Sequence, residues 1–368
     1  MSKKIEIHFA VELTNNSINR GRNGELKKTV NAFGNTYQYI SRQCVNRNVR
    51  EKKMMEEGNR QGKKVTRKEF LEMVDAELNK AGLTDAKKIE EIREAILDAY
   101  GCGSKKEKAG DKATKADEST ENEGKKNETK VDNLIVFLSI KEIAGIVNAL
   151  NEIGWDKVDK KAVGKTVEDC RKNLPMSRDV ALFGRMVASN PILNVRGALN
   201  GSDLVGVTKC IPVNDFFTSK TDTEDENAGA TNLGDIEMAY TIFYGCTVID
   251  VDTLTENLND QSEFETVLSW KYLKDFVENF GKGREHGKFN RTYPFYIAVG
   301  VTEGNAFAIG HHVMADKKNV GEIAEAMHNN LANQPSRIED GFKFVEMNEI
   351  TGEYGDFKQF IKENIQKA

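Results

Sequence analysis

The sequence predicts an α+β fold, in which helical insertions interrupt a sheet. Apolar and polar residues alternate, with the period of a β-strand, in residues 4–13 and 236–251, and residues 294–303 are a further strong strand candidate. Segments of helical period separate these strands at irregular intervals, whereas a doubly wound parallel sheet alternates strands and helices regularly. With 368 residues, the chain is long enough for one large domain or two modest ones. No internal repeat at a fixed period is visible.

The first element is predicted to be a half-buried strand over residues 4–13. Its apolar face consists of Ile5, Ile7, Phe9, Val11 and Leu13. Residues 14–39 are rich in Asn, Gly, Arg and Lys and predict a long loop, with a short strand near Thr36–Ile40. Further strands are predicted at 133–138 and 178–184. In residues 236–251, one face of the strand carries Met238, Tyr240, Ile242 and Tyr244.

Helix starts are predicted from capping residues, whose side chains accept the unpaired backbone N–H groups of a first turn. Ser41 is expected to cap a helix that runs through Val49 and beyond. Four matches to the capping box, a Ser or Thr followed three residues later by Glu, precede apolar helical patterns: Thr66 with Glu69, Ser139 with Glu142, Thr253 with Glu256, and Ser262 with Glu265. Helices are predicted at about 139–153, 262–280 and 319–333, and the boxes at Ser139 and Ser262 stand at the start of the first two.

Residues 104–131 consist mainly of Lys, Glu, Asp, Thr and Gly, with hardly an apolar side chain. Such a segment buries too little apolar surface to offset the entropy lost on ordering. It is predicted to be a disordered tether inserted in a helical subdomain.

The composition predicts a soluble cytoplasmic protein without a cofactor. Hydrophobic residues make up 39% of the chain and charged residues 30%, and no apolar run approaches the ~20 residues of a membrane-spanning helix. Residues 1–13 lack the basic and apolar blocks of a signal peptide. The five cysteines lie far apart, so reduced thiols are expected. A net charge of −5 argues against nucleic-acid binding over the whole surface, and any such site must be local.

The densest basic stretch runs from residue 19 to residue 53, where nine Lys and Arg face only two Glu. If residues 41–53 are helical, Gln43, Arg47 and Arg50 share one face, while Val45 and Val49 point toward a core. Such a stripe could follow a phosphate backbone, because the guanidinium fork matches phosphate oxygens. The alternative is a solvated helix face.

A second candidate is the end of the apolar segment 179–189, at Gly184, Arg185 and Met186. Glycine permits close backbone approach, arginine pairs with phosphate, and methionine packs on a base or sugar. In the alternative, Met186 belongs to the core and Arg185 pairs with Asp179.

Catalytic constellations are poor. His311 and His312 are adjacent, so their side chains would diverge on a strand, and no carboxylate motif accompanies them. The acidic run 222–226 could hold a magnesium ion but is typical of a solvated turn. No nucleotide-binding glycine loop is present, and neither a metal site nor an enzyme is predicted.

Four segments, in order, resemble signatures of one known family. Residues 17–20 (Ser-Ile-Asn-Arg) follow the first strand and are similar to a Leu-Asn-Arg motif. Residues 32–34 (Ala-Phe-Gly) and 39–47 (Tyr-Ile-Ser-Arg-Gln-Cys-Val-Asn-Arg) resemble Phe-Gly-Gly and Arg-Ile-Ser-Ser-Gln-x-Leu-Lys-Arg. Residues 179–189 resemble Asp-x-Ala-Leu-x-Gly-Arg-Met. Residues 227–234, with Phe243 and Tyr244, resemble the segment that leads back into the family's sheet, and 290–293 is a fainter similarity.

By these segments the chain resembles the Cas-seven family, the backbone subunits of CRISPR Cascade complexes, most like the type I-B and I-E branches. The resemblance implies a modified RRM or ferredoxin-like palm with inserted helical fingers and an extended thumb. The expected palm comprises residues 1–53, 177–192 and 236–368, the fingers 54–176, and the thumb 193–235. Arg42 stands where the family has a second Ser, and Asn46 where it has Lys, so one phosphate contact is expected to have moved to Arg42.

The implied function is that of a non-catalytic subunit that polymerises along a CRISPR guide RNA and presents it for pairing with target DNA in antiviral defence. Its partners would be the guide, further copies of itself, other Cascade subunits and, through the guide, target DNA. A filament that assembles on a guide of any sequence must contact groups common to all nucleotides, which are the phosphates and the 2′-hydroxyls. The expected RNA-binding residues are Arg20, Ser41, Arg42, Gln43, Arg47, Arg50, Arg185, Met186 and Ser189, and a thumb wedge at Phe216 and Phe217 would kink the guide unless these two are core residues.

Two alternatives remain open at this stage. Related type III backbone subunits cut RNA with a metal and an aspartate in the early loop, but residues 20–39 contain no Asp. A stand-alone single-strand-binding RRM protein would carry an aromatic-rich strand motif that stacks bases, and Tyr240 and Tyr244 are the nearest approach to it.

Overall fold

The computed structural model divides into two compact units: residues Met1–Gly58 with Gly197–Ala368 (unit 1), and Asn59–Arg196 (unit 2). The structure describes residues 3–19, 26, 29–32, 34–57, 62–101, 135–187, 190–219, 232–280, 292–315, 317, 319–333 and 342–366. The predicted tether, the acidic run 222–226, Arg20 and Ser189 lie outside these residues. No helix in the described part of the chain is long and apolar enough to span a membrane.

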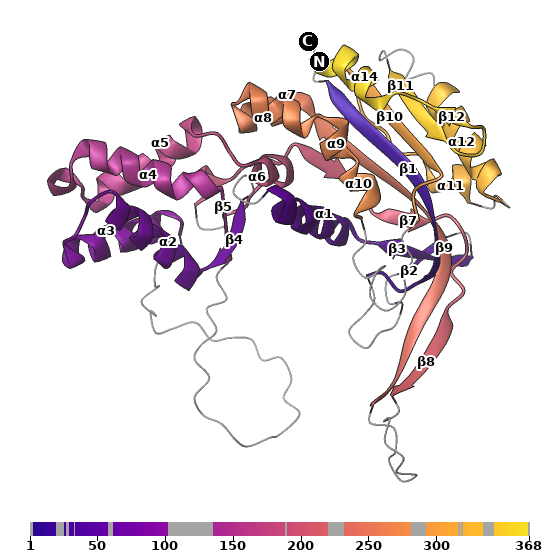
Figure 1. Ribbon diagram of the computed structural model, residues 1–368, viewed down its shortest axis with the longest axis horizontal. Helices are drawn as coiled ribbons and strands as arrows, with labels where there is room; N and C mark the ends of the chain where they lie inside the picture. Colours follow the sequence, from indigo (N-terminus) through magenta and orange to yellow (C-terminus); the bar gives the residue numbers. More distant parts are fainter. Residues whose placement is uncertain are drawn as a thin grey trace, which may run out of the picture. The chain divides into compact units, whose positions relative to one another are not determined.

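Unit 1 is built on one antiparallel sheet with the strand order β12-β11-β10-β1-β9-β7-β3-β2, and β6 and β8 pair with β9 (Figure 1). Its strands are β1 (Lys4–Asn16), β2 (Thr29–Ala32), β3 (Asn35–Ile40), β6 (Leu199–Gly201), β7 (Leu204–Gly206), β8 (Val213–Ser219), β9 (Asn232–Asp250), β10 (Tyr296–Thr302), β11 (Lys343–Asn348) and β12 (Glu353–Tyr354). The mixed α and β class is confirmed, as are the strands predicted at 4–13, 36–40, 236–251 and 294–303.

Strand β1 lies between β9 and β10, and both of its faces are buried. The predicted apolar face is buried, but so are Glu6, His8 and Ala10 on the other face. The prediction of a half-buried strand was therefore wrong. Phe9 packs on Phe280 on one side of the sheet, and Ala10 belongs to the core beneath α11 and α12 on the other. Helices cover both faces of this strand.

The helices of unit 1 are α1 (Arg42–Glu57), α7 (Val251–Leu258), α8 (Gln261–Val267), α9 (Trp270–Leu273), α10 (Asp275–Glu278), α11 (His311–Met314), α12 (Val320–Asn333) and α14 (Phe357–Ile361), which continues as a π-helical turn at Lys362–Gln366. The helix predicted at 319–333 is confirmed. The single helix predicted at 262–280 is instead three short ones, and Ser269 caps the second by accepting the Tyr272 N–H.

Two of the four predicted capping boxes are wrong, because an aspartate two or three residues earlier starts each helix. The Asp250 carboxylate accepts the Thr253 N–H and caps α7. The Asp260 carboxylate accepts the backbone N–H groups of Ser262 and Glu263 and caps α8. A carboxylate already placed at the N-cap satisfies these donors, so the helix begins before the Ser or Thr.

Unit 2 is mainly helical, with α2 (Arg67–Lys80), α3 (Ala86–Ala99), α4 (Ile140–Ile153), α5 (Lys160–Asn173) and α6 (Arg178–Phe183), a two-stranded sheet of β4 (Lys63–Thr66) and β5 (Ile135–Leu138), and short 3-10 helices at Trp155–Lys157 and Pro191–Leu193. Capping boxes at Thr66 and Ser139 start α2 and α4 as predicted. The strand predicted at 178–184 is wrong, because these residues form α6. A short buried apolar run suits either element, and its periodicity does not distinguish them.

Strands β8 and β9 form a two-stranded ribbon that extends beyond the main sheet (Figure 1). The register pairs Val213 with Met238 and Ser219 with Asn232. Because β9 runs on from this ribbon into the centre of the sheet, pairing with β1 from Ala239 to Asp250, one continuous strand supports both.

Candidate nucleic-acid interface

Helix α1 presents a polar face with arginines, as its periodicity predicts. Val45 and Val49 are buried, Gln43 and Arg47 are exposed, and Arg50 is half-buried. The Arg47 side chain is 78% exposed, and its Nε donates to the Glu51 carboxylate at 2.8 Å. An exposed pair of this kind contributes about 1 kcal/mol at most. The Arg47 guanidinium can therefore exchange Glu51 for a phosphate at little cost.

Side chains on the inward face of α1 hold the helix in place. The Lys53 ammonium forms a buried ion pair with Asp275 and lies 3.8 Å from the centre of the Tyr272 ring. The Asn48 side-chain amide donates to the Phe280 carbonyl at 3.1 Å. Lys53 is one of the nine positive residues of the basic stretch, but its charge is used inside the protein. These contacts fix the orientation of the outward face.

The start of α1 joins three segments that are distant in the sequence. The Arg42 guanidinium donates to the Leu199 carbonyl at 2.6 Å, and its backbone N–H donates to the Asp203 carboxylate at 2.6 Å. The Asn19 side-chain amide donates to the Ser41 hydroxyl at 3.4 Å. Arg42 therefore anchors α1 to the β6–β7 region, and the residue that precedes Arg20 in the chain lies beside Ser41.

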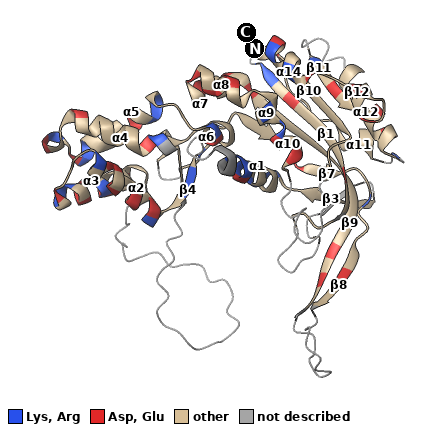
Figure 2. Ribbon diagram, in the orientation of Figure 1, with Lys and Arg blue, Asp and Glu red and all other residues tan. Residues whose placement is uncertain are grey.

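Phe216 and Phe217 are not core residues, because both project from the β8–β9 ribbon. They are 64% and 40% exposed. Neighbouring residues of a strand point to opposite faces, so Phe216 shares a face with Asp235 and Phe217 shares a face with Gly234. The ribbon contains no Lys or Arg over residues 211–219 and 232–241, and it carries Asp215, Asp235 and Glu237 (Figure 2). Its chemistry is aromatic and acidic, unlike that of α1.

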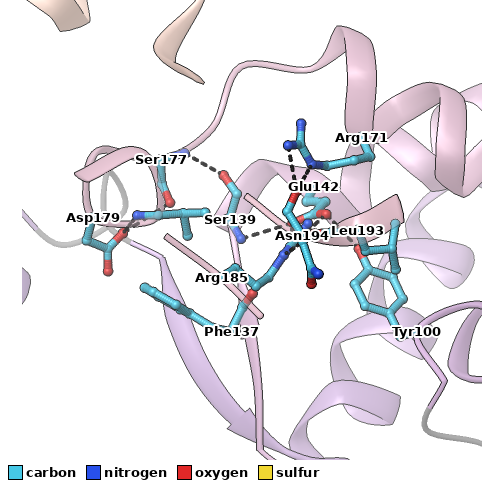
Figure 3. A network of polar contacts seen from close by, with 11 residues as sticks. Tyr100, Phe137, Ser139, Glu142, Arg171, Ser177, Asp179, Arg185, Leu193 and Asn194 are labelled. Atoms are coloured by element: carbon cyan, nitrogen blue, oxygen red, sulfur yellow. Dashed lines mark hydrogen bonds and ion pairs between the residues drawn. The ribbon is translucent and has the colours of Figure 1, made fainter. Parts of the chain in front are cut away.

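Arg185 is buried in unit 2, where the sequence suggested a phosphate contact or a pair with Asp179. Its side chain is 1% exposed, and the guanidinium donates to both oxygens of Glu142, at 2.9 and 2.7 Å, and to the Leu193 carbonyl at 3.0 Å (Figure 3). The Tyr100 hydroxyl donates to the same carboxylate at 2.8 Å, and burial and Glu142 together raise the pKa of Tyr100 above its ordinary value. This network joins α3, α4 and the segment after α6.

The two interactions that the sequence suggested for Arg185, with an RNA phosphate or with Asp179, are therefore not the ones that the structure shows. The guanidinium is enclosed by protein and cannot reach an RNA phosphate in this conformation. Asp179 instead accepts the Ser177 hydroxyl at 3.1 Å and the backbone N–H of Gly62 (Figure 3). Met186 is 84% exposed, so it is not a core residue either. Of the segment 184–186, only Met186 presents its side chain to solvent.

The other chemical candidates have structural partners. His311 Nε2 donates to the Gly206 carbonyl at 3.0 Å, and its ring meets Tyr37 edge-on at 4.5 Å between centroids. Tyr244 is buried, whereas the exposed Tyr240 hydroxyl donates to Glu12 at 2.7 Å. The two tyrosines therefore do not form a common stacking surface. Within the described residues, no cluster of three or more His, Cys, Asp or Glu side chains could hold a metal ion.

Comparison with solved structures finds the same fold in RNA-guided assemblies. A chain described as "CRISPR RNA-guided surveillance complex, pre-nicking" superposes with a TM-score of 0.70 at 19% identity, covering 98% of this chain and 98% of that one. A chain described as "CRISPR RNA-guided surveillance complex" gives 0.59 at 18% identity, covering 99% and 100%. No curated protein sequence is a match.

A family model describes nearly the whole chain. The model of the CT1975-like proteins, whose name Cas_CT1975 carries the prefix of CRISPR-associated proteins, matches residues 5–367. The match includes the residues of α1, the ribbon and unit 2. The chain therefore belongs to the CT1975-like protein family.

Proposed function

We propose that this chain is a guide-RNA-binding backbone subunit of a type I CRISPR surveillance complex. The observation that carries the proposal is the outward face of α1, where Gln43, Arg47 and Arg50 stand on a helix anchored by Arg42 and Lys53. Membership of a CRISPR-associated family and the fold shared with chains of RNA-guided surveillance complexes support the same function.

The α1 face would bind phosphates without reading bases. Guanidinium groups match phosphate oxygens, and neither they nor the Gln43 amide need a particular base at the site. Ser41 directly precedes the first residue of the same helix. Pairing by the guide itself would supply specificity for target DNA. An overall acidic chain is compatible with this, because Arg42, Arg47 and Arg50 form a local group of positive residues on α1.

The ribbon would act differently, through its aromatic side chains. Phe216 is exposed on a two-stranded ribbon whose described residues include no Lys or Arg, so it suits insertion between bases more than contact with phosphates. We assign the ribbon to the thumb, unit 2 to the fingers and the sheet of unit 1 to the palm. In this assignment copies of the chain follow one another along the guide, without catalysis, in the cytoplasm.

The proposed RNA-contacting set on the described residues is Ser41, Arg42, Gln43, Arg47, Arg50 and Met186, with Phe216 and Phe217 as the wedge. Arg185 leaves this set because Glu142 already binds its guanidinium. Arg20 and Ser189 remain proposals from the resemblance. The same resemblance favours the type I-B or I-E branch.

The test is to purify the chain from cells that also express its neighbouring genes and to sequence the RNA that comes with it. Short RNAs of uniform length with repeat-derived ends are expected. Absent RNA, or a heterogeneous mixture, would contradict the proposal. A second assay tests whether the subunit is non-catalytic. The purified complex is incubated with labelled target RNA in the presence of magnesium or of EDTA, and no magnesium-dependent cleavage is expected.

A further inference from the structure

A pocket of about 330 Å³ opens at the root of the β8–β9 ribbon. It is lined by Tyr37, Val207, Thr208, Lys209 and Lys317. Tyr37 belongs to β3, residues 207–209 join β7 to β8, and Lys317 follows α11. Three segments that are far apart in the sequence therefore meet here. None of the residues proposed above for the α1 face or the ribbon lines this pocket.

The pocket carries two positive charges, those of Lys209 and Lys317. Lys209 and Lys317 are exposed, and within the described part of the chain neither ammonium group pairs with a carboxylate. None of the five lining residues is acidic. Two ammonium groups at one cavity repel each other, whereas a bound anion attracts both of them. The charge pattern therefore favours an anionic ligand.

Further donors and an apolar wall narrow the chemistry of this ligand. The Thr208 hydroxyl accepts the Ile242 N–H at 3.1 Å, so its own hydrogen remains available to donate into the pocket. The buried Tyr37 ring is held by the edge of His311, and Val207 lies beside it in the lining. Three donors suit the several oxygens of a phosphate, and the apolar wall suits the carbons of a ribose.

We propose that this pocket binds a phosphate group of the RNA backbone, as a second contact point separate from α1. The inference rests on the proposed function, because it takes the RNA to be the ligand. The pocket adjoins the start of β8, and the Cys210 N–H donates to the Thr36 carbonyl at 2.8 Å, so the root of the ribbon is tied to β3. A phosphate held here positions the strand at the base of the ribbon that carries Phe216.

The experiment measures binding of the full chain to a labelled single-stranded RNA of mixed sequence over a range of potassium chloride concentrations. Each phosphate contact on a single strand contributes about 0.7 to the slope of log affinity against log salt concentration. The double variant Lys209→Ala, Lys317→Ala removes both charges that hold this one phosphate and is expected to lower the slope by about 0.7. The matched control Lys343→Ala, Lys358→Ala removes two exposed lysines elsewhere in unit 1 and is expected to leave the slope unchanged.

The outcomes separate this inference from the proposed function. If the wild-type chain binds no RNA, both fail. If Arg47→Ala with Arg50→Ala lowers the slope but Lys209→Ala with Lys317→Ala does not, only the pocket proposal fails. An equal effect of the lysine control also overturns it, since the loss would then reflect net charge. Titration with inorganic phosphate tests the other source of the same chemistry, and saturable phosphate binding with an unchanged RNA slope would assign the pocket to a small anion instead.

Discussion

The ring of Phe217 lies so close to Gly234, its partner across the ribbon, that a Cβ at position 234 would come within 2.6 Å of Phe217 Cζ. Because Gly234 has no side chain, the Phe217 ring has room to lie over it on one face of the ribbon. Strand alternation then directs Phe216 to the other face, where it is exposed. The contact between Phe217 and Gly234 therefore determines how Phe216 and Phe217 are oriented on the two faces of the ribbon.

Gly234→Ala is expected to displace the Phe217 ring and loosen the ribbon locally; because the atoms met are the far end of a ring that is 40% exposed, the cost is at the low end of the about 1–3 kcal/mol of overpacking. Amide hydrogen exchange in residues 213–218 should become about tenfold faster or more, while exchange in β1 stays unchanged. The control is Gly201→Ala, where a Cβ would meet its nearest neighbour, the Cys246 carbonyl oxygen, at an ordinary 3.5 Å. Unchanged exchange in Gly234→Ala would contradict the packing argument.

Phe216→Ala is expected to leave stability nearly unchanged, within about 0.5 kcal/mol, because the side chain is mostly exposed. It should remove the regularly spaced unstacked bases of the bound guide, which chemical probing of base accessibility in the purified complex would detect. Val213→Ala, an exposed apolar residue on the opposite face of the same strand, serves as the control. A regular pattern that persists in Phe216→Ala would exclude the wedge.

Arg47→Ala with Arg50→Ala is expected to weaken RNA binding similarly for unrelated sequences and to lower the salt slope by about 1.4. Glu51→Gln tests the reverse change, because it keeps the Arg47 charge and removes its carboxylate partner. That variant should bind RNA as well as the wild type or up to about fivefold more tightly, given the small free energy of an exposed pair. A loss confined to one RNA sequence in the arginine variant would refute phosphate binding.

Arg185→Met is expected to destabilise the protein by about 3–5 kcal/mol, since it leaves the buried Glu142 carboxylate without its cation. Urea denaturation followed by far-UV circular dichroism measures this loss. Adding Glu142→Leu should recover part of the stability, because the second change removes the unpaired charge. If Arg185→Met remained fully stable and lost RNA affinity instead, Arg185 would be an RNA contact after all.

His8 is expected to make stability depend on pH. Burial opposes its charged form, but interactions with Cys246 and with the Glu6 carboxylate, 2.9 Å away, outweigh burial and raise the pKa from 6.5 to about 9. A folded-state pKa above the unfolded value means that the stabilisation is complete below pH 6.5 and is lost as pH rises toward 9. The loss is about 3 kcal/mol, as a shift of this size implies.

Thermal unfolding of the wild type and of His8→Gln across this pH range measures the effect. The wild type should lose stability with rising pH, and His8→Gln should show a flatter profile. Parallel profiles in the two proteins would show that another group is responsible.

Local patterns in the sequence predicted much of unit 1. Period two located β1 and β9, and period 3.6 placed Val45 and Val49 inward and Arg47 outward on α1. These features follow from backbone geometry over a few neighbouring residues, so they need no knowledge of distant partners. The same reasoning located the capping boxes at Thr66 and Ser139.

Distant contacts decided the rest. Whether residues 178–183 form a strand or a helix depends on what buries them, and here they form α6. Arg185 pairs with Glu142 rather than with Asp179, and Lys53, one of the positive residues of the basic stretch, pairs with Asp275. The pocket at Lys209 and Lys317 exists only where three separate segments meet.

The sequence by itself therefore determined most of the strands and helices and which face of α1 carries charge. The tertiary structure alone decided which of those charges remain available to a ligand. Periodicity reports the local direction of a side chain, whereas the partner of a charge is chosen by packing between residues far apart in the chain, where burial without a partner is costly.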